Sequence, residues 1–109
     1  MTVPFDAFSQ LDLRVGKIEE VADMPQARKP LYQLRVGFGD GKTLQCVAGI
    51  KQHYTKEQLM GKTVVAVVNL EPRTIAGVVS ECMLLASFTD ESLSLVVPDK
   101  PMQPGDKVG

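Results

Sequence analysis

The stretch that most constrains the fold of this sequence is a run of five apolar residues, Val64–Val68, in which every position is apolar. A strand that is apolar on both faces belongs at the centre of a sheet or in the wall of a barrel. We therefore predict a buried strand over Lys62–Leu70. A second apolar run predicts a strand at Cys82–Phe88. Core packing does not explain the polar residues in and around the connecting segment, so this region is the best place to look for a site: Asn69, Arg73, Ser80 and Glu81.

Alternation of apolar and polar residues predicts three strands before this region, at Leu11–Val21, Leu31–Phe38 and Thr43–Ala48. In the first of them the alternation slips by one residue at Gly16, which is typical of a β-bulge or a barrel bend. The sequence Gly-Asp-Gly-Lys at 39–42 predicts a tight turn between the second and third strands. The three strands therefore form an antiparallel meander.

A short helix is predicted between the third and fourth strands. Thr55 and Gln58 have capping-box spacing, and Gly61 lies where a helix commonly ends. At the N-terminus, Phe5 and Phe8 are three residues apart and predict one helical turn with an apolar side. This turn either covers its own core or packs against a second subunit.

The predicted order of elements indicates an all-β chain with the OB-fold, a five-stranded Greek-key barrel with a short helix between strands 3 and 4. An SH3-like barrel or a small sandwich would fit the spacing nearly as well. A further strand is predicted at Leu93–Val97, and the proline-rich tail, residues 98–109, predicts an extended arm or loop. The length of 109 residues predicts one domain, residues 1–109.

The charge of the chain is segregated along the sequence. The net charge is −1 overall, but residues 1–24 carry −3, residues 25–75 carry +5 and residues 76–109 carry −3. The small overall charge disfavours a non-specific nucleic-acid binder, because phosphate neutralisation supplies most of the affinity of such proteins. The positive charge is concentrated in the middle of the chain, where a solvated face is the default interpretation of any single lysine.

The residues needed for catalysis or metal binding are not grouped in this sequence. His53 is the single histidine, whereas zinc sites need several nitrogen or sulfur ligands at set spacings. Cys46 and Cys82 both lie in apolar runs and predict two packed thiols rather than a disulfide. We therefore expect a binding module with no catalytic residue, no metal and no cofactor.

No apolar run is long enough to cross a bilayer, and the first ten residues lack the features of a signal peptide. We expect a cytoplasmic protein with no membrane partner.

Three ordered motifs resemble a known family: LDLRVGKI at 11–18, GKTVVAVVNLEPRTIAG at 61–77 and SECMLL at 80–85. They are similar to the tRNA-binding domain found in free-standing structure-specific tRNA-binding proteins, in the C-terminal part of many methionyl-tRNA synthetases and in CsaA-like export chaperones. The resemblance implies an OB barrel whose terminal extensions, residues 1–10 and 98–109, form a homodimer. It also implies non-catalytic binding of folded tRNA.

The resemblance implies a set of RNA-binding residues by motif position. The candidates are Asn69, Arg73, Ser80 and Met83, and the supporting cations are Arg14, Lys17, Arg35 and Lys51. An OB face binds nucleic acid through cations that follow the phosphates and through side chains that contact unstacked bases. Because the chain has no tryptophan, recognition of RNA shape is favoured over base stacking.

The sequence also supports a different ligand. The loop Ala27-Arg28-Lys29-Pro30 is similar to the CsaA-like branch, and Cys82 stands where the family often has glycine. The alternative function is therefore a CsaA-like chaperone that binds unfolded or export-bound polypeptides, for which flexible methionines are well suited. An aminoacyl-tRNA synthetase is a further expected partner.

Overall fold

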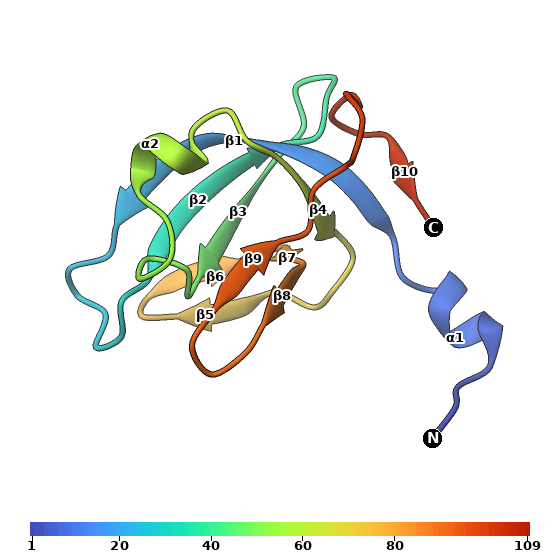
Figure 1. Cartoon of the computed structure of the whole chain (residues 1–109), viewed down its shortest axis with the longest axis horizontal. Coiled ribbons are helices and arrows are strands. Elements are labelled where there is room, and N and C mark those ends of the chain that lie inside the picture. The colour runs from blue at the N-terminus through green and yellow to red at the C-terminus, as the bar shows by residue number, and fades with distance from the viewer.

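The long curved strand β1 (Leu13–Asp23) is the central strand of the fold. The structure is a computed structural model, and it describes all residues from 1 to 109. The other barrel strands are β2 (Tyr32–Gly37), β3 (Thr43–Ala48), β4 (Thr63–Val67) and β7 (Met83–Leu84). All pairings are antiparallel, in the order β3-β2-β1-β4-β7. The first half of β1 pairs with β4 and its second half with β2, which nearly closes the barrel (Figure 1). The predicted OB-fold is confirmed.

The bend of β1 depends on a glycine and on a register shift, which lie at different positions. A Cβ atom at Gly16 would come within 2.6 Å of Val36 and 2.8 Å of Phe38, so only glycine allows β1 to pass this close to β2 and the residue after it. The register shifts between Ile18 and Glu20, not at Gly16 as the alternation predicts. The slip in the pattern therefore marks close packing, and the bulge follows it.

The helix α2 (Lys56–Leu59) closes one end of the barrel, where Leu59 is fully buried. Its capping box is confirmed. Thr55 N–H donates to Gln58 Oε1 at 2.8 Å, and Gln58 N–H donates to Thr55 Oγ1 at 3.2 Å. The core beneath it consists of apolar side chains from β1 to β4, among them Ile18, Leu34 and Val64.

The segment after β4 differs from its prediction as a connecting loop. It folds as a hairpin of β5 (Arg73–Ile75) and β6 (Val78–Ser80). The turn between them is Ala76-Gly77, with φ of 50° and 84°, the left-handed region that two-residue hairpin turns require. This hairpin runs alongside β3 (Figure 1).

The predicted strand Cys82–Phe88 is divided into β7 and β8 (Ala86–Phe88), because the intervening Leu85 changes partner. Its N–H donates to Val65 of β4, while its carbonyl accepts from Val96. The next strand, β9 (Leu93–Leu95), pairs with β8 as a second hairpin.

The terminal extensions meet at the start of β1. The predicted N-terminal helix is confirmed as α1 (Phe5–Ser9), which projects from the barrel and has no buried residue (Figure 1). The tail contains a short strand, β10 (Lys107–Val108), paired with Leu13 and Arg14 of β1. No helix of the structure has the length and hydrophobicity that crossing a membrane requires.

Candidate functional site

The β5–β6 hairpin carries two of the predicted site residues opposite each other. Arg73 on β5 is paired with Ser80 on β6. Arg73 is exposed and takes part in no ion pair, so its guanidinium is available to a ligand. An arginine in this state can bond a phosphate or stack on a base.

Ser80 is occupied inside the protein. Its hydroxyl accepts a hydrogen bond from Val47 N–H at 3.0 Å and donates a long one of 3.4 Å to the carbonyl of Cys82. The neighbouring Glu81 also forms hydrogen bonds with β3. Its backbone N–H donates to Gln45 O at 2.7 Å, and its carboxylate accepts from Gln45 N–H at 2.9 Å. Ser80 and Glu81 thus complete the edge of β3 where no strand pairs with it.

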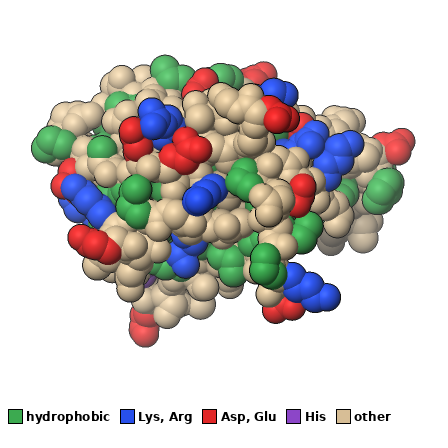
Figure 2. Space-filling model, turned by 90° about the horizontal axis from the view of Figure 1, so that it is seen from above, with side chains coloured by type: hydrophobic (Ala, Val, Ile, Leu, Met, Phe, Trp, Pro, Cys, Tyr) green, Lys and Arg blue, Asp and Glu red, His purple; other side chains and the backbone are tan.

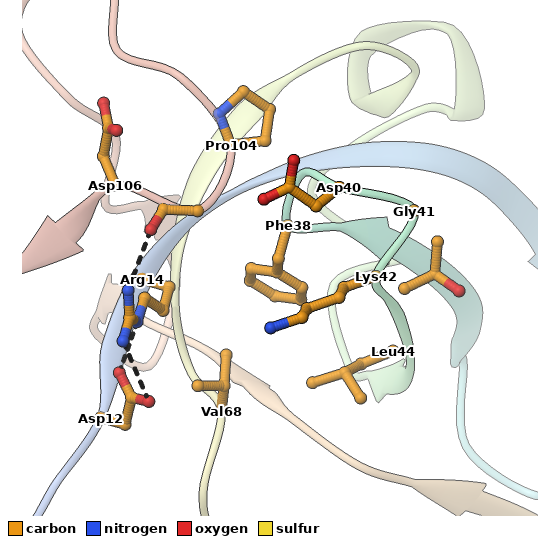
Figure 3. A pocket seen from close by; sticks show the side chains of 12 residues that line it. Asp12, Arg14, Phe38, Asp40, Gly41, Lys42, Leu44, Val68, Pro104 and Asp106 are labelled. Carbon is orange, nitrogen blue, oxygen red and sulfur yellow. Dashed lines mark hydrogen bonds and ion pairs between the residues drawn. The ribbon is translucent and has the colours of Figure 1, made fainter.

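Asn69 and Arg14 hold the terminal extensions on the barrel. The Asn69 amide accepts from Asp12 N–H and donates to Gln10 O, both at 2.8 Å. The Arg14 guanidinium bonds Asp12 at 2.6 Å and the carbonyl of Gly105 at 3.1 Å, as Figure 3 shows. The polar groups of both predicted contact residues are therefore engaged in linking residues 10–12 and 105 to the barrel.

A groove of about 760 Å³ lies beside Arg14, between β1, the β2–β3 turn and the tail (Figure 3). Its charged side chains are three carboxylates and two cations, namely Asp12, Asp40, Asp106, Arg14 and Lys42. Because carboxylates outnumber cations, this groove does not attract phosphate.

The predicted cations Arg35 and Lys51 are both ion-paired. Arg35 bonds Glu20 at 2.7 Å and lies 3.7 Å from Glu19. Acidic and basic side chains are interspersed over the face of the molecule seen in Figure 2, so that face presents no continuous positive patch.

Lys51 shares a carboxylate with a second lysine. Asp23 lies 2.8 Å from Lys56 and 3.0 Å from Lys51. The hydrogen bond from Lys56, followed by that from Lys51, lowers the pKa of Asp23. The same contact with Asp23 raises the pKa of Lys56. The nearby Glu57 carboxylate also raises the pKa of Lys56, so two carboxylates accompany the two lysines at this end of the barrel.

The remaining predicted residues are open to solvent. Lys17 is exposed and unpaired. Met83 is 48% exposed and lies at an almost wholly hydrophobic groove of about 320 Å³, between the end of β3 and the β7–β9 segment. Of the eight predicted residues, only Lys17, Arg73 and Met83 have side chains free of internal polar contacts.

Two cations that were not among the predicted site residues lie in the loop between β1 and β2. Arg28 and Lys29 are exposed and unpaired. In an OB-fold this loop and the segment between the fourth and fifth barrel strands bind oligonucleotides. The sequence feature that indicates them is a pair of adjacent cations in a proline-bounded loop of a predicted OB-fold.

The two cysteines are free buried thiols in contact, which confirms the prediction of packed thiols. The hydrogen bond with Cys46, and then burial, raises the pKa of Cys82. Hydrogen bonding by Cys82 holds the pKa of Cys46 below its usual value. No group of three or more metal-ligating side chains occurs, and His53 lies exposed.

Comparisons with known proteins identify relatives of this chain in sequence and in structure. A family model described as "Putative tRNA binding domain" matches residues 13–107. The chain is 48% identical over 108 residues to a methionine–tRNA ligase of Pyrococcus abyssi, covering 99% of this chain but 15% of that protein. The chain therefore spans about one seventh of the length of that ligase.

Two solved structures share the whole fold. A CsaA chaperone protein from Picrophilus torridus is 38% identical with a TM-score of 0.92, covering 99% of this chain and 100% of that one. A MetRS-related protein from Pyrococcus horikoshii is 28% identical with a TM-score of 0.90, covering 100% and 99%.

Proposed function

This chain belongs to the tRNA-binding domain family, and we propose that it binds folded tRNA as a homodimer and catalyses no reaction. The observation that carries the proposal is the match to that family over residues 13–107, which include the whole barrel. The exposed, unpaired Arg73 and Lys17 supply cations for phosphates, and Met83 supplies an apolar contact. Cations that follow the phosphates are one of the two means by which an OB surface binds single-stranded nucleic acid, the other being aromatic side chains that stack on bases.

The proposed dimer is supported by the apolar side chains of the extensions. Phe5 is 77% exposed and Phe8 41% exposed, and their rings contact each other at 6.2 Å between centroids. The tail adds exposed Met102, and Val97 directly before the tail is also exposed. Asn69 and Arg14 hold both extensions at the start of β1, so residues 1–10 and 98–109 can form one apolar surface for a second copy.

Light scattering during size-exclusion chromatography tests the dimer. We expect twice the chain mass for the wild type and the mass of one chain for Phe5→Ser/Phe8→Ser. Because neither ring is buried in the protomer, the double variant should keep its circular dichroism spectrum. A wild-type protein that elutes as a monomer at all concentrations would contradict the dimer.

Gel-shift titration with folded and heat-denatured tRNA tests the ligand. Binding should favour the folded form and weaken steeply with salt. Arg73→Ala should cost on the order of 1–3 kcal/mol of binding free energy if the contact is specific. The neighbouring Thr74 is exposed and makes no side-chain hydrogen bond, so Thr74→Ala is the matched control. Equal, weak binding to both forms of tRNA would refute the function.

Binding of extended polypeptide is the second candidate function, and the hydrophobic groove beside Met83 favours it. Phe88 and Met83, which are 76% and 48% exposed, both lie at this groove, and exposed apolar side chains that gather in one place mark interaction sites. The similar protein of Picrophilus torridus is named as a chaperone. Suppression of aggregation of an unfolded client, lost in Phe88→Ser, would support this candidate, and no suppression by the wild type would exclude it.

Association with an aminoacyl-tRNA synthetase is a proposed partnership that follows from the relatives. The methionine–tRNA ligase of Pyrococcus abyssi contains a segment 48% identical to this chain. We propose that the chain delivers tRNA to such an enzyme in trans. Co-purification with a synthetase that depends on tRNA would support this role.

A further inference from the structure

We propose that Cys46 and Cys82 form a site of reversible oxidation, at which a hydroperoxide converts the two thiols into a disulfide that closes the barrel covalently. The disulfide would join residues 45–47 to residues 80–82, and these two segments are defined here as the β3–β7 junction. The inference goes beyond the proposed function, because it concerns the barrel itself and holds whichever ligand binds.

The β3–β7 junction is the place where the barrel lacks strand pairing. β3 and β7 are the two end strands in the order β3-β2-β1-β4-β7, and no ladder connects them. Cys46 lies on β3, and Cys82 directly precedes β7. A bond between the two side chains therefore links both ends of the sheet and completes the ring of barrel strands.

The backbone across the junction brings the two cysteines together. Glu81 N–H donates to Gln45 O at 2.7 Å, and each of these residues is followed by one of the cysteines. Both thiols belong to the buried core cluster, and they form a hydrogen bond with each other. Thiols that already touch need only a small movement to bond, whereas cysteines whose Cα atoms are more than about 7 Å apart cannot be joined without moving the backbone.

Cys46 is the thiol that meets an oxidant first. It lines the hydrophobic groove beside Met83, whereas Cys82 does not. The hydrogen bond from Cys82 also holds the pKa of Cys46 below its usual value, and the thiolate is the nucleophilic form of cysteine. Because Cys46 is 1% exposed, a peroxide reaches it only when the junction opens locally, so oxidation should be limited by this opening.

The reaction consumes one hydroperoxide for each pair of thiols. The Cys46 thiolate attacks one peroxide oxygen, the O–O bond breaks, and the departing oxyanion takes up the proton that Cys46 lost. The Cys82 sulfur then attacks the sulfenic acid formed on Cys46, the S–O bond breaks, and the departing hydroxide leaves as water with the proton of Cys82. Two electrons pass from the thiols to the peroxide. A dithiol reductant reverses the bond by thiol–disulfide exchange.

The disulfide should stabilise the barrel and fix the shape of the groove. A cross-link between Cys46 and Cys82 restricts the unfolded chain, which raises the stability of the folded state. Met83, the residue after Cys82, lines the groove together with Cys46. The bond therefore ties together two parts of the groove wall that only hydrogen bonds and packing hold in the reduced protein.

The test compares the full chain treated with hydrogen peroxide with the same chain kept in a dithiol reductant. Mass spectrometry of the treated chain should show the loss of two hydrogen atoms. Trypsin cleaves between the cysteines at Lys51, Lys62 and Arg73, so the two cysteine peptides should be found joined only after oxidation. At one protein concentration, Tm should rise by about 10–20 °C and return to its first value after reduction.

Variants test the partner and the route of access separately. Cys82→Ala keeps Cys46 without its partner, so peroxide should add oxygen to Cys46 and give no rise in Tm. Ser80→Ala removes the hydrogen bond to Val47 across the junction and should speed disulfide formation by about three- to tenfold, the range that one lost hydrogen bond allows. Thr74→Ala on the same hairpin should oxidise at the wild-type rate. Equal rates in Ser80→Ala and wild type would overturn the route through the junction.

Three results with the wild type would overturn the proposal. Two thiols that remain free after peroxide treatment would show that the pair does not react. Cysteine peptides joined only between chains would show that the thiols do not reach each other within one barrel. An internal disulfide with unchanged or lowered Tm would show that the bond does not close the barrel. None of these measurements uses RNA, so their failure is distinguishable from failure of the proposed function.

Discussion

Replacing Ser80 by alanine tests whether this side chain closes the barrel or contacts RNA. Its hydroxyl is the acceptor for Val47 N–H at 3.0 Å, on the edge of β3 that faces away from β2. Alanine removes this acceptor and adds none. The backbone N–H of Val47 would then have no hydrogen-bond acceptor in the protein, next to the hydrogen bonds between Glu81 and Gln45.

The expected cost follows from the burial of the two partners. A buried donor that loses its acceptor costs about 1–3 kcal/mol. Val47 and Ser80 are both half-buried, so water reaches the site in part, and we expect the lower half of that range, about 1–2 kcal/mol. In a domain of about this size each kcal/mol lowers Tm by roughly 4–8 °C.

Urea unfolding followed by circular dichroism measures this free energy. All variants are compared at one protein concentration, because the stability of a dimer depends on concentration. Thr74→Ala on the same hairpin is the control and should leave the free energy of unfolding unchanged within about 0.5 kcal/mol. An unchanged free energy of unfolding in Ser80→Ala, together with weakened tRNA binding, would show that Ser80 contacts RNA and would refute the structural role.

Three further changes test other parts of the structure. Asn69→Ala should lower the free energy of unfolding by about 1 kcal/mol and speed amide exchange at Asp12, since the amide bonds Asp12 and Gln10; unchanged exchange would contradict this. The lowered pKa of Asp23 means that its contribution to stability is present above its ordinary pKa of 3.8 and is lost as pH falls through the lower folded value. The difference in stability between wild type and Asp23→Asn, measured by urea titration across pH, should therefore be constant near neutrality and disappear in acid; a constant difference down to the lowest pH would oppose it. Leu59→Ala should cost about 2–5 kcal/mol in thermal unfolding, because the side chain is fully buried; a loss below 1 kcal/mol would show that the helix does not close the core.

The central strands could be predicted because burial determines their pattern directly. β2 and β3 each place one face on the core, so Leu34, Val36 and Cys46 are buried and alternate with exposed or half-buried residues. The capping box at Thr55 is equally local, since its partner is three residues away. Patterns of this kind need no knowledge of the rest of the chain.

The β5–β6 hairpin was not predicted because burial does not specify it. Each strand has three residues, and Arg73 and Thr74 on β5 are both exposed. What forms it is the Ala76-Gly77 turn and contacts with β3, such as Gln45 Nε2 to Val79 O at 2.9 Å. A turn centred on alanine is a weak indicator in a sequence, because φ above zero is uncommon for residues other than glycine.

The roles of the polar site residues could not be predicted from the sequence for a different reason. A polar residue that interrupts an apolar pattern indicates that its side chain has a polar partner, but it does not indicate which group that partner is. The partners are distant in sequence: Asn69 bonds Asp12, Ser80 bonds Val47 and Arg14 bonds Gly105. Three residues that could have faced a ligand instead join segments that only the folded barrel brings together.

The loop between β1 and β2 adjoins the hydrophobic groove beside Met83, and this position relates the two candidate ligands. Leu31 ends this loop, and its Cδ2 lies 3.7 Å from where a Cβ of Gly49 would be, while Gly49 lines the groove. None of the residues 24–31 lines the groove, yet a tRNA that contacts Arg28 and Lys29 in this loop would lie beside it. Bound tRNA should therefore exclude an extended polypeptide from the groove, so that the two ligands compete even though different side chains bind them.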